Sequence, residues 1–219
     1  MLSGMPELVV LTLAPIAAYL VGAIPFALLV GRSVGIDLLT QGSRNPGAGN
    51  LTRLAGLRYG VAAAVADGLK GLLPVLLARR AGLPAEVAAV TGIAAVVGHN
   101  WSVYLGGRAG RGLATAVGVA VGVAPMLLIW TTLWAVVGWK MGGGLGGFVG
   151  WGVLPAYAIT AGQPLIVVMV AVSLASIILV RRAQGSPGDA RGWRNMVSRV
   201  VWDTDTRPSA LEAENAVAS

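Results

Sequence analysis

The sequence predicts an all-α fold of the polytopic integral membrane class, and three observations support this. Of its 219 residues, 56% are hydrophobic and only 11% are charged, and the mean hydropathy is +0.76. Soluble domains carry about 25% charged residues. The apolar residues also gather in runs close to the roughly 20 residues that a membrane-spanning helix needs. Cysteine is absent and His99 is the single histidine, which excludes a disulfide framework and a histidine-built metal site.

The apolar runs give the candidate spans in order. The candidates are residues 6–30, 59–78, 84–98, 113–139, 145–160 and 164–180. The first run has no basic segment before it, which predicts a retained helix and not a cleaved signal peptide. Residues 113–139 contain Pro125, which suits a turn better than a helix interior. This run therefore forms either one long helix or two short ones.

The distribution of basic residues favours two helices there, and hence seven spans. With seven spans, one side receives 13 of the 16 Lys and Arg residues, while Lys70 lies within a span and Arg79 and Arg80 lie opposite. Those 13 are Arg32, Arg44, Arg53, Arg58, Arg108, Arg111, Lys140, Arg181, Arg182, Arg191, Arg194, Arg199 and Arg207. The positive-inside rule then predicts an N-terminus outside and a C-terminus in the cytoplasm. The net charge of +7 therefore indicates membrane orientation and no nucleic-acid partner.

The chain divides into a transmembrane region, residues 1–182, and a polar cytoplasmic tail, residues 183–219. Within the tail, residues 193–206 read WRNMVSRVVWDTDT and place apolar residues at helical spacing between arginines. This pattern is typical of an amphipathic helix at the membrane interface. A poorly ordered tail is the alternative.

Two loops on the predicted cytoplasmic side combine glycine, arginine and neutral hydrogen-bonding residues. Residues 42–53 read GSRNPGAGNLTR and residues 98–115 read GHNWSVYLGGRAGRGLAT, and neither contains a carboxylate. Glycine lets backbone amides converge on an anion, and arginine offers a forked, permanent positive charge. A helix beginning after Gly112 would add its N-terminal donors. The pattern fits a phosphorylated ligand at the membrane surface, and it fits equally well arginines that only anchor the loops to lipid headgroups.

Three ionisable residues fall within or at the end of the predicted spans. Asp67 and Lys70 are three residues apart, so they share a helix face, and such a pair usually faces the bundle interior. A structural ion pair is the favoured interpretation, and a wall of the ligand site is the alternative. His99 either terminates its helix or positions a polar group beside the second loop.

These residues resemble the motifs of the bacterial acyl-phosphate:glycerol-3-phosphate acyltransferases, the PlsY family, and the resemblance covers roughly residues 10–180. The first motif, GSxNxGAxNxxRxxG, is matched by Gly42, Ser43, Asn45, Gly47, Ala48, Asn50, Arg53 and Gly56. A D-x-x-K-G motif is matched by Asp67, Lys70 and Gly71. The next motif, GH followed by GxKGGKGxAT, is matched by Gly98, His99, Gly106, Gly110, Gly112, Ala114 and Thr115, with Arg108 and Arg111 at lysine positions.

The resemblance implies a seven-helix protein of the bacterial plasma membrane whose active site faces the cytoplasm. It implies transfer of a fatty acyl group from acyl phosphate to the 1-hydroxyl of glycerol 3-phosphate, giving lysophosphatidic acid and phosphate, with no metal or other cofactor. The implied catalytic residues are Ser43, Arg53 and Arg111. The implied substrate- or phosphate-binding residues are Gly42, Asn45, Gly47, Asn50, Lys70, His99, Arg108, Gly110, Gly112 and Thr115.

The family's substrate phosphate is implied to act as the base. No carboxylate lies within four residues of His99, so we expect no histidine–carboxylate base.

Two departures from the family pattern leave alternatives open. After Lys140, a K-x-x-x-S-x-x-S pattern has glycine, Gly144 and Gly147, at both serine positions. After the last span, a histidine-containing H-R-E-N-I-x-R-L stretch is missing, and Arg182 keeps one basic position.

Three hypotheses follow. The first is a working acyltransferase whose site uses arginine where the family pattern has lysine. The second is a weakened paralogue that binds phosphorylated lipid precursors or a partner. The third is a small membrane transporter or scaffold whose loops contact only headgroups.

Overall fold

The computed structural model describes residues 7–107, 109–140, 144–185 and 191–202, and within these ranges every regular element is a helix. The elements are α1 (Glu7–Ala23), α2 (Phe26–Ser33), α3 (Ala48–Ala55), α4 (Leu57–Arg80), α5 (Ala85–Asn100), a 3₁₀ turn η1 (Val103–Leu105), α6 (Leu113–Val123), α7 (Leu127–Lys140), α8 (Gly144–Gly152), α9 (Leu154–Thr160), α10 (Leu165–Gln184) and α11 (Trp193–Trp202). The predicted all-α class is confirmed.

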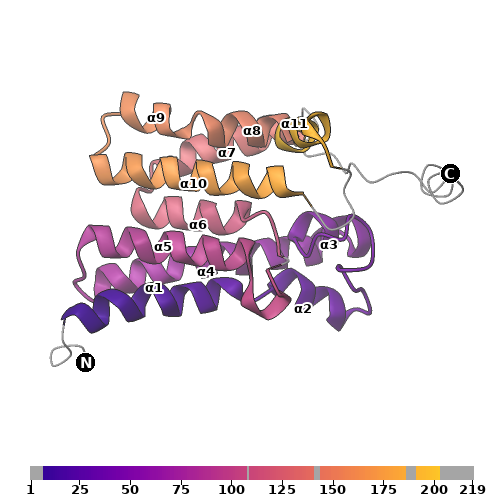
Figure 1. The fold of residues 1–219 in the computed structure, drawn as a ribbon, viewed down its shortest axis with the longest axis horizontal. Coiled ribbons are helices and arrows are strands. Elements are labelled where there is room, and N and C mark those ends of the chain that lie inside the picture. The colour runs from indigo at the N-terminus through magenta and orange to yellow at the C-terminus, as the bar shows by residue number, and fades with distance from the viewer. Residues whose placement is uncertain (1–6, 108, 141–143, 186–190, 203–219) are drawn as a thin grey trace, which may run out of the picture.

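Most of the helices run along one common direction, and the short helices α3 and α11 lie at one end of this bundle (Figure 1). Helices α1, α4, α5 and α6 pack together, and α10 joins them to α7, α8 and α9 through its contacts with α5 and α8. α10 ends at the same end of the bundle as α3 and contacts α11, whereas α1 begins at the opposite end (Figure 1). The bundle therefore has one end that gathers the connecting loops.

Three helical segments are long and apolar enough to cross a membrane, namely residues 10–33, 57–80 and 165–184. Their outward faces carry large apolar side chains, such as Leu13 and Leu73, that are exposed. Such faces are costly in water and suit a surrounding of lipid. The segments agree with three of the predicted spans and support an integral membrane protein.

Proline marks the points at which the apolar runs divide. Residues 113–139 form α6 and α7, separated at residues 124–126 around Pro125, as the charge distribution predicted. The first run bends between α1 and α2 at Pro25. Residues 145–160 also form two helices, α8 and α9, which the sequence prediction treated as one run. The reason is Pro155, which occupies the first turn of α9, where a missing amide costs no hydrogen bond.

Glycine allows α4 and α6 to approach closely. A Cβ at Gly118 would collide with the backbone oxygen of Gly68, and a Cβ at Gly71 would collide with the backbone oxygen of Thr115. Small residues at such crossings are a common basis of helix association in membranes. These glycines fix α6, and with it the loop that leads into α6.

We expect Gly118→Ala to destabilise the bundle by about 1–3 kcal/mol, because the added methyl group would force α4 and α6 apart. The matched control is Gly152→Ala, since a Cβ at Gly152 meets nothing within 4 Å. Thermal unfolding of both variants in detergent micelles measures the difference. Equal melting temperatures for the two variants would contradict the tight α4–α6 contact.

Candidate functional site

Residues 48–53, which the sequence prediction placed in the first loop, belong to α3, so the first loop is residues 34–47. It is held against α3 by Asn50. The Oδ1 atom of buried Asn50 accepts the amide of Ser43 at 3.0 Å, and its Nδ2 donates to the backbone oxygen of Gln41 at 3.0 Å. Gly42 has φ +59°, and a Cβ there would collide with the Asn50 side chain. Both ends of the Asn50 amide are used within the loop, so we assign this residue to holding the loop's shape.

The contact between Ser43 of this loop and Arg53 of α3 is the one best suited to an anion. Arg53 Nη2 donates to Ser43 Oγ at 3.1 Å, with Arg53 exposed on α3 and Ser43 half-buried. Gly47 is the N-cap of α3, so the first amides of α3 have no acceptor within the helix. Asn45 lies beside Gly47, and its buried Oδ1 has no hydrogen-bond partner among the described residues. The loop thus brings a guanidinium, a hydroxyl and backbone amides together.

Residues 98–100 and 113–115 of the predicted second loop belong to α5 and α6, so the second loop is residues 101–112, which turns the chain from one helix into the other. Gly106, Gly107 and Gly112 have φ values of +58°, +77° and +73°, which other residues adopt with strain. At Gly112 a Cβ would also collide with the Asn100 side chain. Gly112 is the N-cap of α6, so the helix start that the sequence predicted beside this loop is confirmed.

Polar side chains surround the start of α6 and are closed off from solvent. Asn100 and Thr115 are 0% exposed, and neither the Asn100 amide nor the Thr115 hydroxyl has a hydrogen-bond partner among the described residues. Gly110 packs directly on the ring of His99, since a Cβ there would collide with Nε2. Unpaired buried polar groups are rare in proteins. The buried polar groups at the start of α6 therefore lack hydrogen-bond partners among the described residues.

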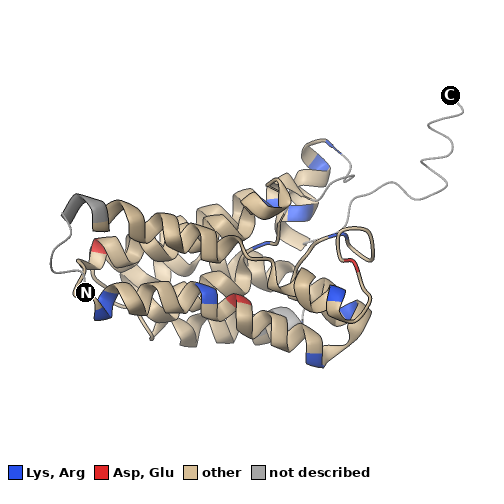
Figure 2. Ribbon diagram, turned by 90° about the horizontal axis from the view of Figure 1, so that it is seen from below, with Lys and Arg blue, Asp and Glu red and all other residues tan. Residues whose placement is uncertain are grey.

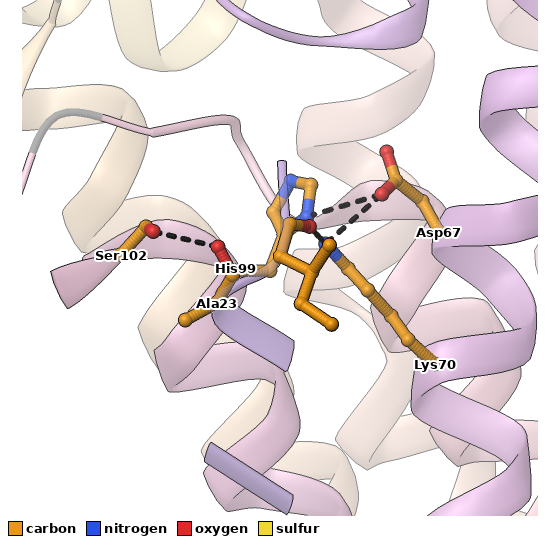
Figure 3. A network of polar contacts seen from close by, with 6 residues as sticks. Ala23, Asp67, Lys70, His99 and Ser102 are labelled. Carbon is orange, nitrogen blue, oxygen red and sulfur yellow. Dashed lines mark hydrogen bonds and ion pairs between the residues drawn. The ribbon is translucent and has the colours of Figure 1, made fainter. Parts of the chain in front are cut away.

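Asp67, Lys70 and His99 meet in the interior, where α4 and α5 pack together (Figure 3). Lys70 Nζ lies 2.9 Å from Asp67 Oδ1 and also donates to the backbone oxygen of Ile24 at 2.8 Å. Ser102 Oγ donates to the backbone oxygen of Ala23 at 2.6 Å. Because α1 ends at this point, its last carbonyl groups are available as acceptors. The cluster ties α1, α4 and the second loop together, and it favours the structural interpretation of Lys70.

His99 has a carboxylate neighbour that lies far from it in the sequence. His99 Nδ1 lies 3.7 Å from Asp67 Oδ1, a proximity that sequence separation hides because the carboxylate comes from another helix. The distance exceeds hydrogen-bond range, and the same oxygen is already paired with Lys70. The contact therefore does not amount to a hydrogen-bonded histidine–carboxylate base.

The two loops lie at the same end of the bundle. Leu105 of the second loop packs against the buried cluster that contains Leu38 of the first loop and Leu51 of α3. Most of the Lys and Arg residues in the described part of the chain also gather toward this end (Figure 2). Arg111 of the second loop is half-buried, and Arg108 lies outside the described residues.

Arg181 is a candidate site residue that the sequence prediction missed. This buried side chain on α10 donates to three backbone oxygens: from Nε to Asn100 at 3.2 Å, from Nη2 to Ala109 at 2.8 Å and from Nη1 to Gly185 at 2.9 Å. The positive charge of Arg111 also acts on it. Arg181 thus fastens the second loop to α10. The signal in the sequence is the pair of adjacent arginines that follows the last predicted span, of which the family pattern uses only Arg182.

The two glycines at the missing serine positions lie against Arg182 and α11. A Cβ at Gly144 would collide with the backbone of Trp202, and a Cβ at Gly147 would lie 3.0 Å from Arg182 Nη2. Arg182 Nη1 and Nη2 donate to the backbone oxygen of Gly144 at 3.2 and 3.1 Å. A guanidinium and a helix therefore occupy the space beside these glycines.

The known proteins that this chain resembles carry the same family name. Residues 12–185 match the glycerol-3-phosphate acyltransferase family. A glycerol-3-phosphate acyltransferase of Geotalea daltonii is 46% identical over 114 residues, which are 52% of this chain and 59% of that protein. One of Rubrobacter xylanophilus is 36% identical over 179 residues, 80% of this chain and 88% of that protein. The chain thus spans less than two thirds of the length of the Geotalea relative but most of the Rubrobacter one.

Solved structures agree with these relatives. The crystal structure of PlsY, an integral membrane glycerol 3-phosphate acyltransferase, in its glycerol 3-phosphate form is 31% identical with a TM-score of 0.75. The likeness covers 93% of this chain and 98% of that one. Its lysophosphatidic acid form matches equally well, with a TM-score of 0.75. From the extent of the sequence match and these structural likenesses, the chain belongs to the glycerol-3-phosphate acyltransferase family.

Proposed function

We propose that this chain is a membrane acyltransferase that moves a fatty acyl group from acyl phosphate to the 1-hydroxyl of glycerol 3-phosphate, giving lysophosphatidic acid and phosphate. The observation that carries the proposal is the placement of both glycine–arginine loops at one end of an apolar bundle. Both substrates carry a phosphate, and one carries a long acyl chain. An anion site at the membrane end of such a bundle suits both.

The proposed topology has seven crossings, made by α1 with α2, by α4, α5, α6 and α7, by α8 with α9, and by α10. The N-terminus lies outside and the loop end faces the cytoplasm, in the plasma membrane of a bacterium. The gathering of basic residues at the loop end supports this orientation. Residues 1–182 form the transmembrane region and residues 183–219 the cytoplasmic tail.

The proposed reaction needs positioning and charge neutralisation more than a protein base. The 1-hydroxyl oxygen attacks the acyl carbon, the bond from that carbon to the phosphate oxygen breaks, and its electron pair leaves with phosphate. The hydroxyl proton ends on a phosphate oxygen of the substrate. Ser43, Arg53 and Arg111 stabilise the charge on the departing phosphate. Asn45, Gly47 and the start of α6 orient the phosphate groups.

The remaining assignments follow from the contacts. Asn50, Gly42 and Gly112 keep the loops in shape. Gly110 leaves room for the ring of His99, and Lys70 ties α4 to the end of α1. Thr115 offers its unpaired hydroxyl at the start of α6. Arg108 adds a further positive charge to the second loop in this proposal.

An assay of the purified protein in lipid nanodiscs, supplied with palmitoyl phosphate and glycerol 3-phosphate, tests the proposal. We expect lysophosphatidic acid by mass spectrometry and release of phosphate that requires both substrates, with no product from palmitoyl-CoA. A PlsY enzyme prepared alongside is the control. Glycerol 3-phosphate binding without product would identify the weakened paralogue. Binding that survives Ser43→Ala and Arg53→Ala would identify a transporter or scaffold.

A further inference from the structure

Helix α11 exposes large apolar side chains and buries one arginine against the protein. Trp193, Met196 and Val197 follow one another at helical spacing on one side, and they are 69%, 42% and 44% exposed. Arg199 lies on the other side and is only 8% exposed. A helix on the surface of a soluble domain buries its apolar stripe, so this arrangement is inverted.

The docked side of α11 is held by reciprocal arginine contacts. Arg199 of α11 donates from Nη2 to the backbone oxygen of Ala183 on α10 at 3.1 Å. Arg182 of α10 donates from Nη1 to the backbone oxygen of Val200 on α11 at 2.8 Å. Each helix thus supplies an arginine to the last turn of the other, where carbonyl groups have no partner within the helix. The orientation of α11 is therefore set by polar contacts and leaves the apolar side uncovered.

The position of α11 identifies lipid as the cover. In Figure 1 its axis is seen nearly end-on while α10 runs across the picture, so α11 crosses the end of α10. The flank of α10 exposes Met169 and Val180, which continue an apolar surface toward this end. A helix lying across the end of a membrane-spanning helix has its axis close to the membrane plane.

The charges beside the exposed side indicate the kind of lipid. Arg191 and Arg194 are both exposed, and the Arg194 guanidinium lies 5.6 Å from the centre of the Trp193 ring. Residues 191–202 contain no Asp or Glu. A basic, tryptophan-bearing interfacial helix partitions most strongly onto an anionic surface.

We propose that α11 is an in-plane membrane anchor whose Trp193, Met196 and Val197 insert at the boundary between headgroups and acyl chains, while Arg191 and Arg194 bind anionic phospholipid headgroups. The anchor does not depend on the proposed acyl transfer. A failed activity assay and a failed anchor are therefore distinguishable.

The absence of cysteine in the whole chain allows a clean test by site-directed spin labelling. Single variants Met196→Cys, Val197→Cys and Asn195→Cys are labelled with a nitroxide in the full chain, and Met169→Cys on α10 is the lipid-facing reference. The protein is reconstituted in phosphatidylcholine, with or without phosphatidylglycerol. Collisions with oxygen, which concentrates in lipid, and with a water-soluble nickel complex are then measured by electron paramagnetic resonance.

We expect positions 196 and 197 to resemble position 169, with oxygen collisions exceeding nickel collisions. Position 195, which is half-buried on another side of the helix, should show a lower oxygen-to-nickel ratio than they do. Phosphatidylglycerol should raise the oxygen-to-nickel ratio at 197, and the double variant Arg191→Gln, Arg194→Gln should lose that increase. Higher nickel than oxygen access at 196 and 197 would overturn the anchor, because the side would then face water. Low access to both reagents, with spin–spin broadening, would overturn it in favour of a second copy of the chain. An oxygen-to-nickel ratio at position 197 that is unchanged by phosphatidylglycerol would overturn the proposed preference for anionic lipid.

Discussion

Arg53→Ala is expected to lower the kcat/KM of acyl transfer by roughly 100-fold or more, the size of effect seen when one donor to a developing negative charge is removed. Arg53 is the charged member of the first loop's anion contact, joined to Ser43 Oγ at 3.1 Å. Its guanidinium is exposed, so its removal should leave the fold intact. Initial rates with palmitoyl phosphate and glycerol 3-phosphate measure the loss.

The matched control is Arg58→Ala. Arg58 is also exposed, but it donates to the neighbouring Tyr59 hydroxyl at 2.9 Å and lies over that ring. We expect its removal to change the rate less than twofold, since it holds nothing in either loop. Arg53→Lys should recover only part of the activity, because an ammonium lacks the planar fork. Full activity of Arg53→Ala would show that the first loop is not the phosphate site.

Arg181→Met should raise the KM for the phosphorylated substrates roughly tenfold, because the second loop would be misplaced, and it should also destabilise the protein. Three backbone oxygens would lose a charged donor, and two of them, those of Asn100 and Ala109, flank or belong to the second loop. Each lost contact of this kind costs about 1–3 kcal/mol. Steady-state kinetics well below the melting temperature separate the loss of loop position from loss of fold.

The control for Arg181 is Arg79→Met at the far end of the bundle. Arg79 Nη1 also donates to a backbone oxygen, that of Gly122, at 2.8 Å. Its loss should lower the melting temperature without changing KM. If the two variants gave the same kinetic constants at equal folded fraction, Arg181 would have only a structural role. Arg181→Lys should restore part of the affinity, since an ammonium cannot span all three acceptors.

The breaks in the bundle show what sequence can predict. The turn at Pro125 followed from charge, because an unbroken helix would have moved the remaining basic residues across the membrane. The break between α8 and α9 was missed, although Pro155 marks it. The residues on both sides of this break are apolar. No basic residue lies near enough for the charge distribution to decide between one helix and two. Hydropathy alone does not show a helix boundary when the residues on both sides of it are apolar.

The two loops could be predicted from sequence because the residues that define them are close together in the chain. Each loop combines glycines, arginines and hydrogen-bonding side chains in a short stretch. The positive φ values at Gly42 and Gly112 show that glycine is required at these turns. The neighbours of His99 and Arg181 come from helices distant in the chain. Their positions depend on which faces of α4, α5 and α10 pack together, and a short motif does not encode that.

The tail shows the same limit. Apolar and basic spacing predicted a helix from residue 193, and α11 spans Trp193–Trp202. The pattern could not show which side would dock. That choice depends on carbonyl groups at the end of α10, which receive the arginine of the polar side.

The contact between α11 and Gly144 also makes residue 144 and the tail dependent on each other. No side chain fits at Gly144 while the Trp202 backbone lies against it. A Gly144→Ser chain would therefore have to release α11 from its present position. A tail grafted onto a protein that carries a side chain at this position should likewise fail to dock in the same place.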